Sequence, residues 1–310
     1  MKLALNTFTV MLLKNDFIIY FNCDTFEVFK AKNNRVFKIA KNCTEDFEKI
    51  EPFFIDAENN KLGIISGNNC DIKFFEIKNF TLKNLHLWYS RIIKTDKKYF
   101  VSLKYKEKTL YDEIYKNFVQ IYDIKTEELL EEIFLNYQLI SVSPNEKFGI
   151  FTLYNKDTFL YSFKEKKRLI DFNYGQKYLD IAKFSPNGRY IFFVYGYDLN
   201  GKGLGIVYDF EKNDFIYNIN YHLFTNDFFK ISFTKDSKYI ILSCTDLFVS
   251  IFETETGNIL SNNENIHTFL YDEENNKIAY FLKDTDNRMD YEIYIEDFDN
   301  FLEREIKLFN

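Results

Sequence analysis

The sequence has few of the residues on which enzyme and metal sites usually depend. It contains three histidines, His86, His222 and His267, and four widely separated cysteines. That cysteine spacing fits neither a zinc knuckle nor a redox pair nor a disulfide framework. A hydrolase triad or a histidine-ligated metal would need histidines to converge, and these three lie in different parts of the chain. We therefore expect no catalytic residue, no cofactor and no metal ion.

Glycine and long hydrophobic runs are also scarce. The segment Gly201-Lys-Gly203-Leu-Gly205 has the glycines of a phosphate loop, but a strand pattern follows it rather than a helix, so we expect a hairpin loop. No window approaches the roughly 18 uninterrupted apolar residues of a membrane span. The apolar N-terminal stretch is interrupted by Asn6 and Thr7, unlike a signal peptide. These features predict a cytoplasmic protein with no membrane contact.

The charge of the chain argues against nucleic-acid binding. Its 40 basic residues are scattered among 47 acidic ones, and the formal net charge is −7. The longest basic run, residues 164–168, is interrupted by Glu165. A nucleic-acid binder needs clustered lysine and arginine to neutralise phosphates. We expect no nucleic-acid partner.

A repeat of strands and tight turns runs along the whole chain. Its clearest copy, residues 179–219, reads as a strand, a Ser-Pro-Asn-Gly turn and three further strands. Corresponding first turns are spaced 38 to 49 residues apart, at Asp16, Glu58, Asp96, Asn145, Asn187, Asp236 and Glu274. Blades of a propeller repeat every 40 to 45 residues or so. The repeat predicts an all-β fold, a seven-bladed β-propeller of four-stranded antiparallel blades, as a single domain over residues 1–310.

The repeat resembles the WD-repeat propellers. An aspartate stands six residues before the aromatic residue that ends a third strand, at Asp157 before Phe163 and Asp246 before Phe252. Tyr122-Asp123 and Tyr208-Asp209 take the place of the family's Trp-Asp ending, and the Gly-His dipeptide is missing. The resemblance implies the propeller architecture. It transfers no functional residue, because the family's Asp-His-Ser/Thr-Trp network cannot form where phenylalanine or tyrosine replaces tryptophan.

Two choices of strand follow from the repeat. Residues 125–134 have helical composition, but they fall where the repeat requires a turn and an outer strand, so we predict a strand. The outer strand of the last blade could come from residues 2–5 or from residues 305–309. The sequence leaves these two alternatives, and the oligomeric state, open.

Loop length gives the only pointer to a binding site. Three blades have long connections between their second and third strands, at residues 104–118, 196–203 and 283–290. Insertions in repeat proteins often gather on the binding face, although surface loops also tolerate insertion for no functional reason. Tyrosine and tryptophan are common interface anchors. The candidate partner-binding residues are Tyr105, Tyr111, Tyr115, Tyr197, Tyr291 and Trp88.

These features favour a non-catalytic propeller that serves as a platform for a protein partner. One alternative is a propeller enzyme of hydrolase or lyase type with its site at the mouth of the central channel. Another is a glycan-binding lectin. Residues 198–203 and 284–290 have the alternating oxygen donors of part of a calcium loop, but turn chemistry also explains them.

Overall fold

The computed structural model describes most of the chain, and everything below concerns these residues. They are residues 2–4, 10–14, 17–22, 25–32, 35–43, 50–56, 61–66, 71–76, 82–85, 91–95, 97–108, 113–123, 125–126, 128–153, 157–172, 179–195, 202–222, 230–244, 248–283 and 290–309. They form mostly β-strands, which confirms the all-β prediction, together with one helix. No helix among them is long and apolar enough to cross a membrane.

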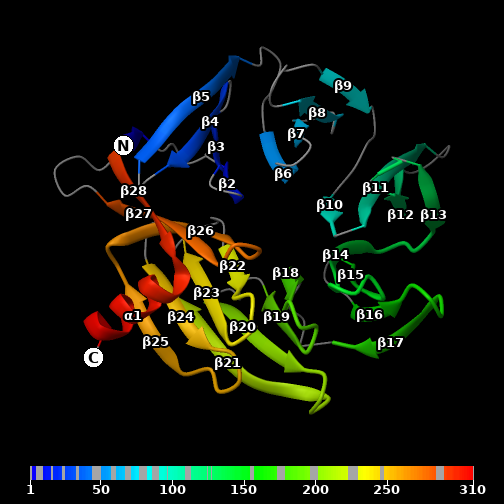
Figure 1. Ribbon diagram of the computed structural model, residues 1–310. Coiled ribbons are helices and arrows are strands. Elements are labelled where there is room, and N and C mark those ends of the chain that lie inside the picture. The colour runs from blue at the N-terminus through cyan, green and yellow to red at the C-terminus, as the bar shows by residue number, and fades with distance from the viewer. Residues whose placement is uncertain are drawn as a thin grey trace. The chain divides into compact units, whose positions relative to one another are not determined.

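The described strands form seven antiparallel four-stranded sheets (Figure 1). The chain divides into two compact units, one with residues 87–226 and 255–257 and the other with the rest. The first unit contains three of the sheets. Their strands are β10 (Arg91–Lys94), β11 (Lys98–Lys108), β12 (Glu113–Asp123) and β13 (Leu129–Ile133); β14 (Gln138–Val142), β15 (Phe148–Thr152), β16 (Thr158–Ser162) and β17 (Lys167–Asp171); β18 (Leu179–Phe184), β19 (Tyr190–Tyr195), β20 (Lys202–Asp209) and β21 (Asp214–His222).

The second unit contains the other four sheets. Three of them consist of consecutive strands, namely β2 (Val10–Lys14), β3 (Phe17–Asn22), β4 (Thr25–Lys32) and β5 (Arg35–Cys43); β6 (Ile50–Asp56), β7 (Lys61–Ser66), β8 (Asp71–Glu76) and β9 (Leu82–Leu85); β22 (Lys230–Phe233), β23 (Tyr239–Cys244), β24 (Phe248–Glu253) and β25 (Ile259–Asn263). Within each unit the first strands of consecutive sheets are neighbours: β14 contacts β10 and β18, while β26 contacts β22 and β2, and β2 contacts β6.

The seventh sheet brings the two ends of the chain together. Strands β26 (Ile266–Asp272), β27 (Lys277–Lys283) and β28 (Asp290–Asp297) are followed by β1 (Lys2–Ala4), which pairs antiparallel with β28 and places Leu3 opposite Tyr291. The first of the two predicted alternatives is therefore correct. The second is wrong, because residues 305–309 belong to helix α1 (Phe298–Phe309).

Helix α1 forms because its apolar residues recur at helical spacing. Phe298, Phe301 and Leu302 are buried on one side of it, against residues of the β22–β25 and β26–β28 sheets. Residues 305–309 were one of two candidates for an outer strand, because the repeat required a fourth strand in the last sheet. The three-to-four-residue apolar period over Phe298–Phe309 favours a helix instead.

The β14–β17 sheet is apolar on both faces. Along β15, Ile150 packs with residues of the β18–β21 sheet, whereas the next residue, Phe151, packs with residues of the β10–β13 sheet. Alternate residues of a strand point to opposite faces, so the middle sheet of the first unit is buried on both sides. The same alternation recurs in β16, where Leu160 and Phe159 divide between the two clusters.

Three of the predicted first turns share one hydrogen-bond pattern. A hydroxyl donates to the side-chain oxygen two residues later, over 2.8 Å for Ser143–Asn145, 2.7 Å for Ser185–Asn187 and 2.7 Å for Thr234–Asp236. The residue after each Asn or Asp has a positive φ, 59° at Glu146, 73° at Gly188 and 63° at Ser237. These local bonds fix where each first strand ends and the second begins.

Candidate functional site

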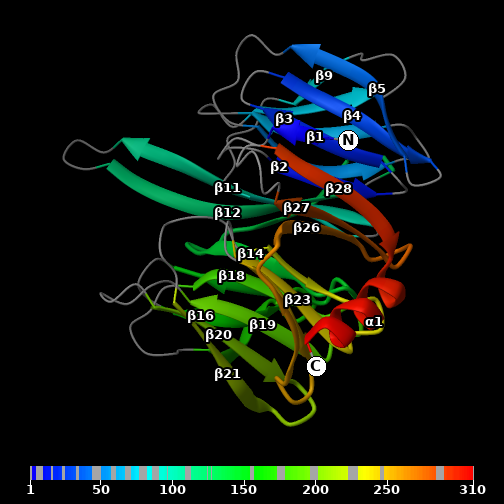
Figure 2. The ribbon, with the colours of Figure 1, turned by 90° about the vertical axis from the view of Figure 1, so that its left-hand side faces the viewer.

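Strands β11 and β12 are much longer than the strands beside them. The pairing of β11 with β10 ends at Ser102, and the pairing of β12 with β13 ends at Val119. The two strands nevertheless remain paired with each other from Leu103–Phe118 out to Lys108–Glu113. Among the described residues this outer part is a two-stranded ribbon, seen as a long projection in Figure 2. We call residues 103–108 and 113–118 the β-arm.

The β-arm corrects one part of the sequence prediction. Residues 104–118 were expected to form a loop, but most of them are strand, with Tyr105 opposite Lys116 and Tyr115 opposite Lys106. Tyr291 likewise lies in β28 rather than in the preceding connection, and it belongs to the other compact unit. The segment looked like a loop because it is rich in lysine and glutamate. A ribbon that is not covered by other strands can carry such residues and still pair.

The remaining candidate residues cannot be placed. Tyr111, Tyr197 and Trp88 lie outside the described residues, as do Asp246 and most of the two calcium-like segments. The structure therefore brings Tyr105 and Tyr115 onto neighbouring strands and leaves the role of the others a prediction. His222 ends β21, the fourth strand of its sheet.

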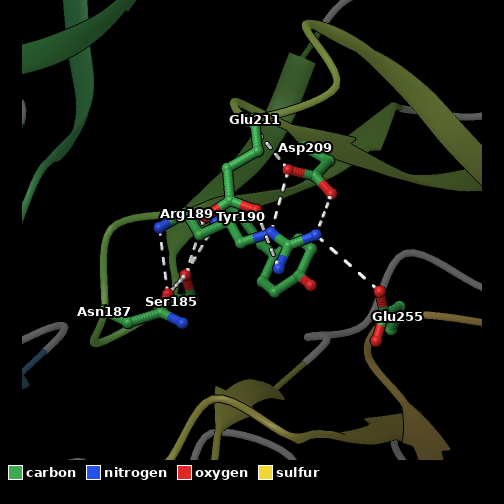
Figure 3. Close-up of polar contacts among 7 residues, drawn as sticks. All are labelled: Ser185, Asn187, Arg189, Tyr190, Asp209, Glu211 and Glu255. Atoms are coloured by element: carbon green, nitrogen blue, oxygen red, sulfur yellow. Dashed lines mark hydrogen bonds and ion pairs between the residues drawn. The ribbon is translucent and has the colours of Figure 1, made fainter.

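A polar cluster surrounds Arg189, at the end of the Ser-Pro-Asn-Gly turn (Figure 3). The guanidinium donates two hydrogen bonds to Asp209, from Nε to Oδ1 over 3.1 Å and from Nη2 to Oδ2 over 2.7 Å. It also contacts Glu211 at 3.0 Å and Glu255 at 3.8 Å, and it lies 4.8 Å from the centre of the Tyr190 ring. The Asp209 side chain is completely buried, whereas both glutamates are mostly exposed.

The electrostatics of the cluster follow from this geometry. The hydrogen bonds from Arg189 lower the pKa of Asp209 below its ordinary value, although burial opposes the shift. The backbone N–H of Glu211 donates to the same carboxylate over 2.9 Å. The hydrogen bond to Asp209 in turn raises the pKa of Arg189. Asp209 and Arg189 therefore both stay charged. Each provides the opposite charge that a buried ionised group needs.

The cluster is suited to structure rather than to catalysis. The Ser185 hydroxyl donates to Asn187 and accepts the Tyr190 amide over 2.9 Å, so it is engaged within the turn. Within the seven residues of Figure 3 there is no histidine or other free base beside this hydroxyl. Asp209 ends the third strand of its sheet, as the sequence predicted. What the sequence did not reveal is its pairing with Arg189.

A second set of contacts connects two neighbouring sheets. Glu146 follows Asn145 in the first turn of the β14–β17 sheet, and its Oε1 accepts the Thr95 hydroxyl over 2.6 Å and the Lys97 amide over 3.1 Å. Its Oε2 lies 3.5 Å from Lys98 Nζ. Thr95 and Lys97 precede β11, so this glutamate joins the turns of adjacent sheets.

The described residues hold no metal-binding cluster. In the ranges that the structure covers, no group of three or more histidine, cysteine, aspartate or glutamate side chains could hold a metal ion.

Asp157 precedes β16 as predicted, and its carboxylate contacts Arg168 at 3.3 Å and the Tyr137 hydroxyl at 3.5 Å. This aspartate therefore takes part in an exposed polar contact at the end of its sheet.

No family model matches the chain, and no curated protein matches it.

Proposed function

We propose that the chain is a seven-bladed β-propeller that acts as a protein-interaction platform, with the β-arm as its contact element. Seven four-stranded sheets, first strands that neighbour one another within each unit, and the pairing of β1 with β28 support the propeller. Each feature is expected when blades follow one another around an axis and the last blade takes its outer strand from the start of the chain.

The β-arm is the observation that carries the proposed function. An isolated two-stranded ribbon is at best marginally stable in water. Its outer pairs, from Leu103–Phe118 to Lys108–Glu113, extend beyond the pairing that builds the sheet. They add a strand pair that the sheet does not need for its own ladder. Exposed strand edges are ready to pair with or dock another chain, which is how they serve in recognition.

Replacing the outer part of the β-arm tests this proposal. In the test variant a short Gly-Ser turn replaces residues 106–116. Strand pairs from Tyr99–Tyr122 to Lys104–Asn117 remain, so the melting temperature should stay close to that of the wild type. The matched control changes the exposed Lys164 and Glu165, in the β16–β17 turn of the same unit, to serine.

The readout is capture of partner proteins from the native cell, followed by binding of the purified partner. A partner that binds the wild type and the turn control, but not the shortened variant, supports the proposal. Undiminished binding by the shortened variant contradicts it. Loss of the fold in that variant would show that the ribbon stabilises the sheet, and single substitutions in the β-arm would then replace it as the test.

A further inference from the structure

The two faces of the β-arm differ in charge. Directly opposed residues of an antiparallel pair lie on one face, and successive residues alternate between faces. One face therefore carries three lysines from β11 and, opposite them on β12, a single acidic residue. We call it the lysine face. It consists of Lys104, Lys106 and Lys108 with Asn117, Tyr115 and Glu113 opposite them.

The other face has four apolar or aromatic residues and no net charge. Its six residues are Leu103, Tyr105 and Glu107 with Phe118, Lys116 and Ile114 opposite them. One lysine and one glutamate offset each other there. The lysine face thus has an excess of two positive charges on a chain whose formal net charge is −7. This contrast is a property of the strand register and does not appear in the overall composition.

We propose that the lysine face binds an acidic, extended segment of a protein partner. The three lysines occupy alternate residues of one strand, so their backbone positions repeat about every 7 Å. An extended chain with acidic residues at alternate positions has the same spacing. Pairing these acidic residues with the three lysines would offset the repulsion among the lysines by attraction between opposite charges. This inference rests on the proposed function of the β-arm, and it adds the chemistry of the partner.

A protein segment fits better than a nucleic acid. The acidic residues of the chain outnumber the basic ones, and such a balance disfavours a polyanion that extends over a large surface. A short acidic segment needs only the local field of the β-arm. Charged groups in a contact guide and select a partner more than they tighten its binding.

The register supplies a matched pair of variants for the test. Lys106 stands opposite Tyr115 on the lysine face, and Lys116 stands opposite Tyr105 on the other face. Lys106→Glu and Lys116→Glu therefore make the same charge reversal, opposite the same residue type, on the two faces of one ribbon. The probe is a fluorescein-labelled peptide of repeated Glu-Ser units, titrated with the full chain at low ionic strength and followed by anisotropy.

We expect Lys106→Glu to weaken peptide binding by roughly tenfold, the effect of losing and reversing one charge contact, and Lys116→Glu to change it by less than about twofold. Added salt should weaken wild-type binding, because exposed charge pairs are screened. A variant with arginine at residues 104, 106 and 108 keeps the charge and should bind like the wild type. Circular dichroism of each variant checks the fold.

Three results would overturn the inference. They are no binding of the peptide by the wild type, equal losses in the two reversal variants, and tighter binding of an oligothymidylate of the same charge. None of these results contradicts the proposed function, which is tested separately by whether the shortened variant still captures its partner. Partner loss in that variant without peptide binding would keep the β-arm as the contact and reject an acidic segment as its ligand.

Discussion

At the scale of single residues, Asp209 and Arg189 depend on each other. Asp209 is fully buried at the end of β20, and a buried carboxylate without a partner is strongly destabilising. The two-point contact from Arg189 supplies that partner, and the Tyr190 ring supports the guanidinium. In WD-repeat propellers a network around tryptophan braces each blade. Here an arginine–aspartate pair joins the first turn of a sheet to the end of its third strand.

Replacing the arginine should therefore be costly. We expect Arg189→Met to lower the free energy of unfolding by about 2–4 kcal/mol, because it leaves Asp209 buried and unpaired. Lys238 occupies the equivalent position of another first turn but is largely exposed, and Lys238→Met should cost less than about 0.5 kcal/mol. Urea unfolding of both variants measures the difference. Similar costs for the two would refute a special role for Arg189.

The same pair predicts a dependence of stability on pH. Arg189 lowers the pKa of Asp209 in the folded chain, so the unfolded chain binds a proton more readily at this site. The stabilisation is complete above the ordinary aspartate pKa of about 3.9 and is lost as the pH falls through the lowered folded value. Stability of the wild type should fall more steeply below about pH 4 than stability of Asp209→Asn. Parallel acid-unfolding curves would contradict this prediction.

At the scale of elements, helix α1 attaches to two sheets through neighbouring residues. Arg304 contacts Glu296 of β28 at 2.6 Å and stacks near the Tyr280 ring of β27. The buried Glu305 accepts a hydrogen bond from Asn263 of β25 over 2.8 Å. The helix thus connects the β22–β25 sheet with the sheet that contains both ends of the chain, and it covers the edge strand β25.

The apolar side of the helix should dominate this attachment. Phe301 is fully buried, and we expect Phe301→Ala to destabilise the chain by about 3–5 kcal/mol through the cavity that it leaves. Leu308 lies in the same helix but is 71% exposed, so Leu308→Ala should be within about 0.5 kcal/mol of the wild type. Thermal unfolding followed by circular dichroism compares the two. If both were neutral, the helix would not contribute to the stability of its sheets.

Sequence reasoning succeeded where the signal is local. The turns at Asn145, Asn187 and Asp236 were predicted from their turn residues and their recurrence along the chain, and in each a serine or threonine hydroxyl donates to the Asn or Asp side chain two residues later. It failed where the deciding contact is distant or the composition misleads. Arg189 and Asp209 are joined only after β19 and β20 have paired, and the lysine-rich β-arm has the composition of a loop.

At the scale of the whole molecule, a single domain over residues 1–310 is expected to unfold in one cooperative transition. Arg189 and Phe301 belong to different compact units. In one domain, Arg189→Met and Phe301→Ala should each shift the same calorimetric transition, and its calorimetric and van't Hoff enthalpies should agree. Two separate transitions, each moved by only one of the substitutions, would show that the units unfold independently.

The position of β1 also determines the order in which the chain can mature. Leu3 is synthesised well before Tyr291, the residue it faces in the sheet. The sheets formed by β10–β21 can assemble while synthesis continues, because each uses consecutive strands. The strand β1 cannot form this pairing until β28 has been synthesised, and such distant pairing is slow. A ribosome-stalled chain that lacks β28 should therefore expose β1 to protease.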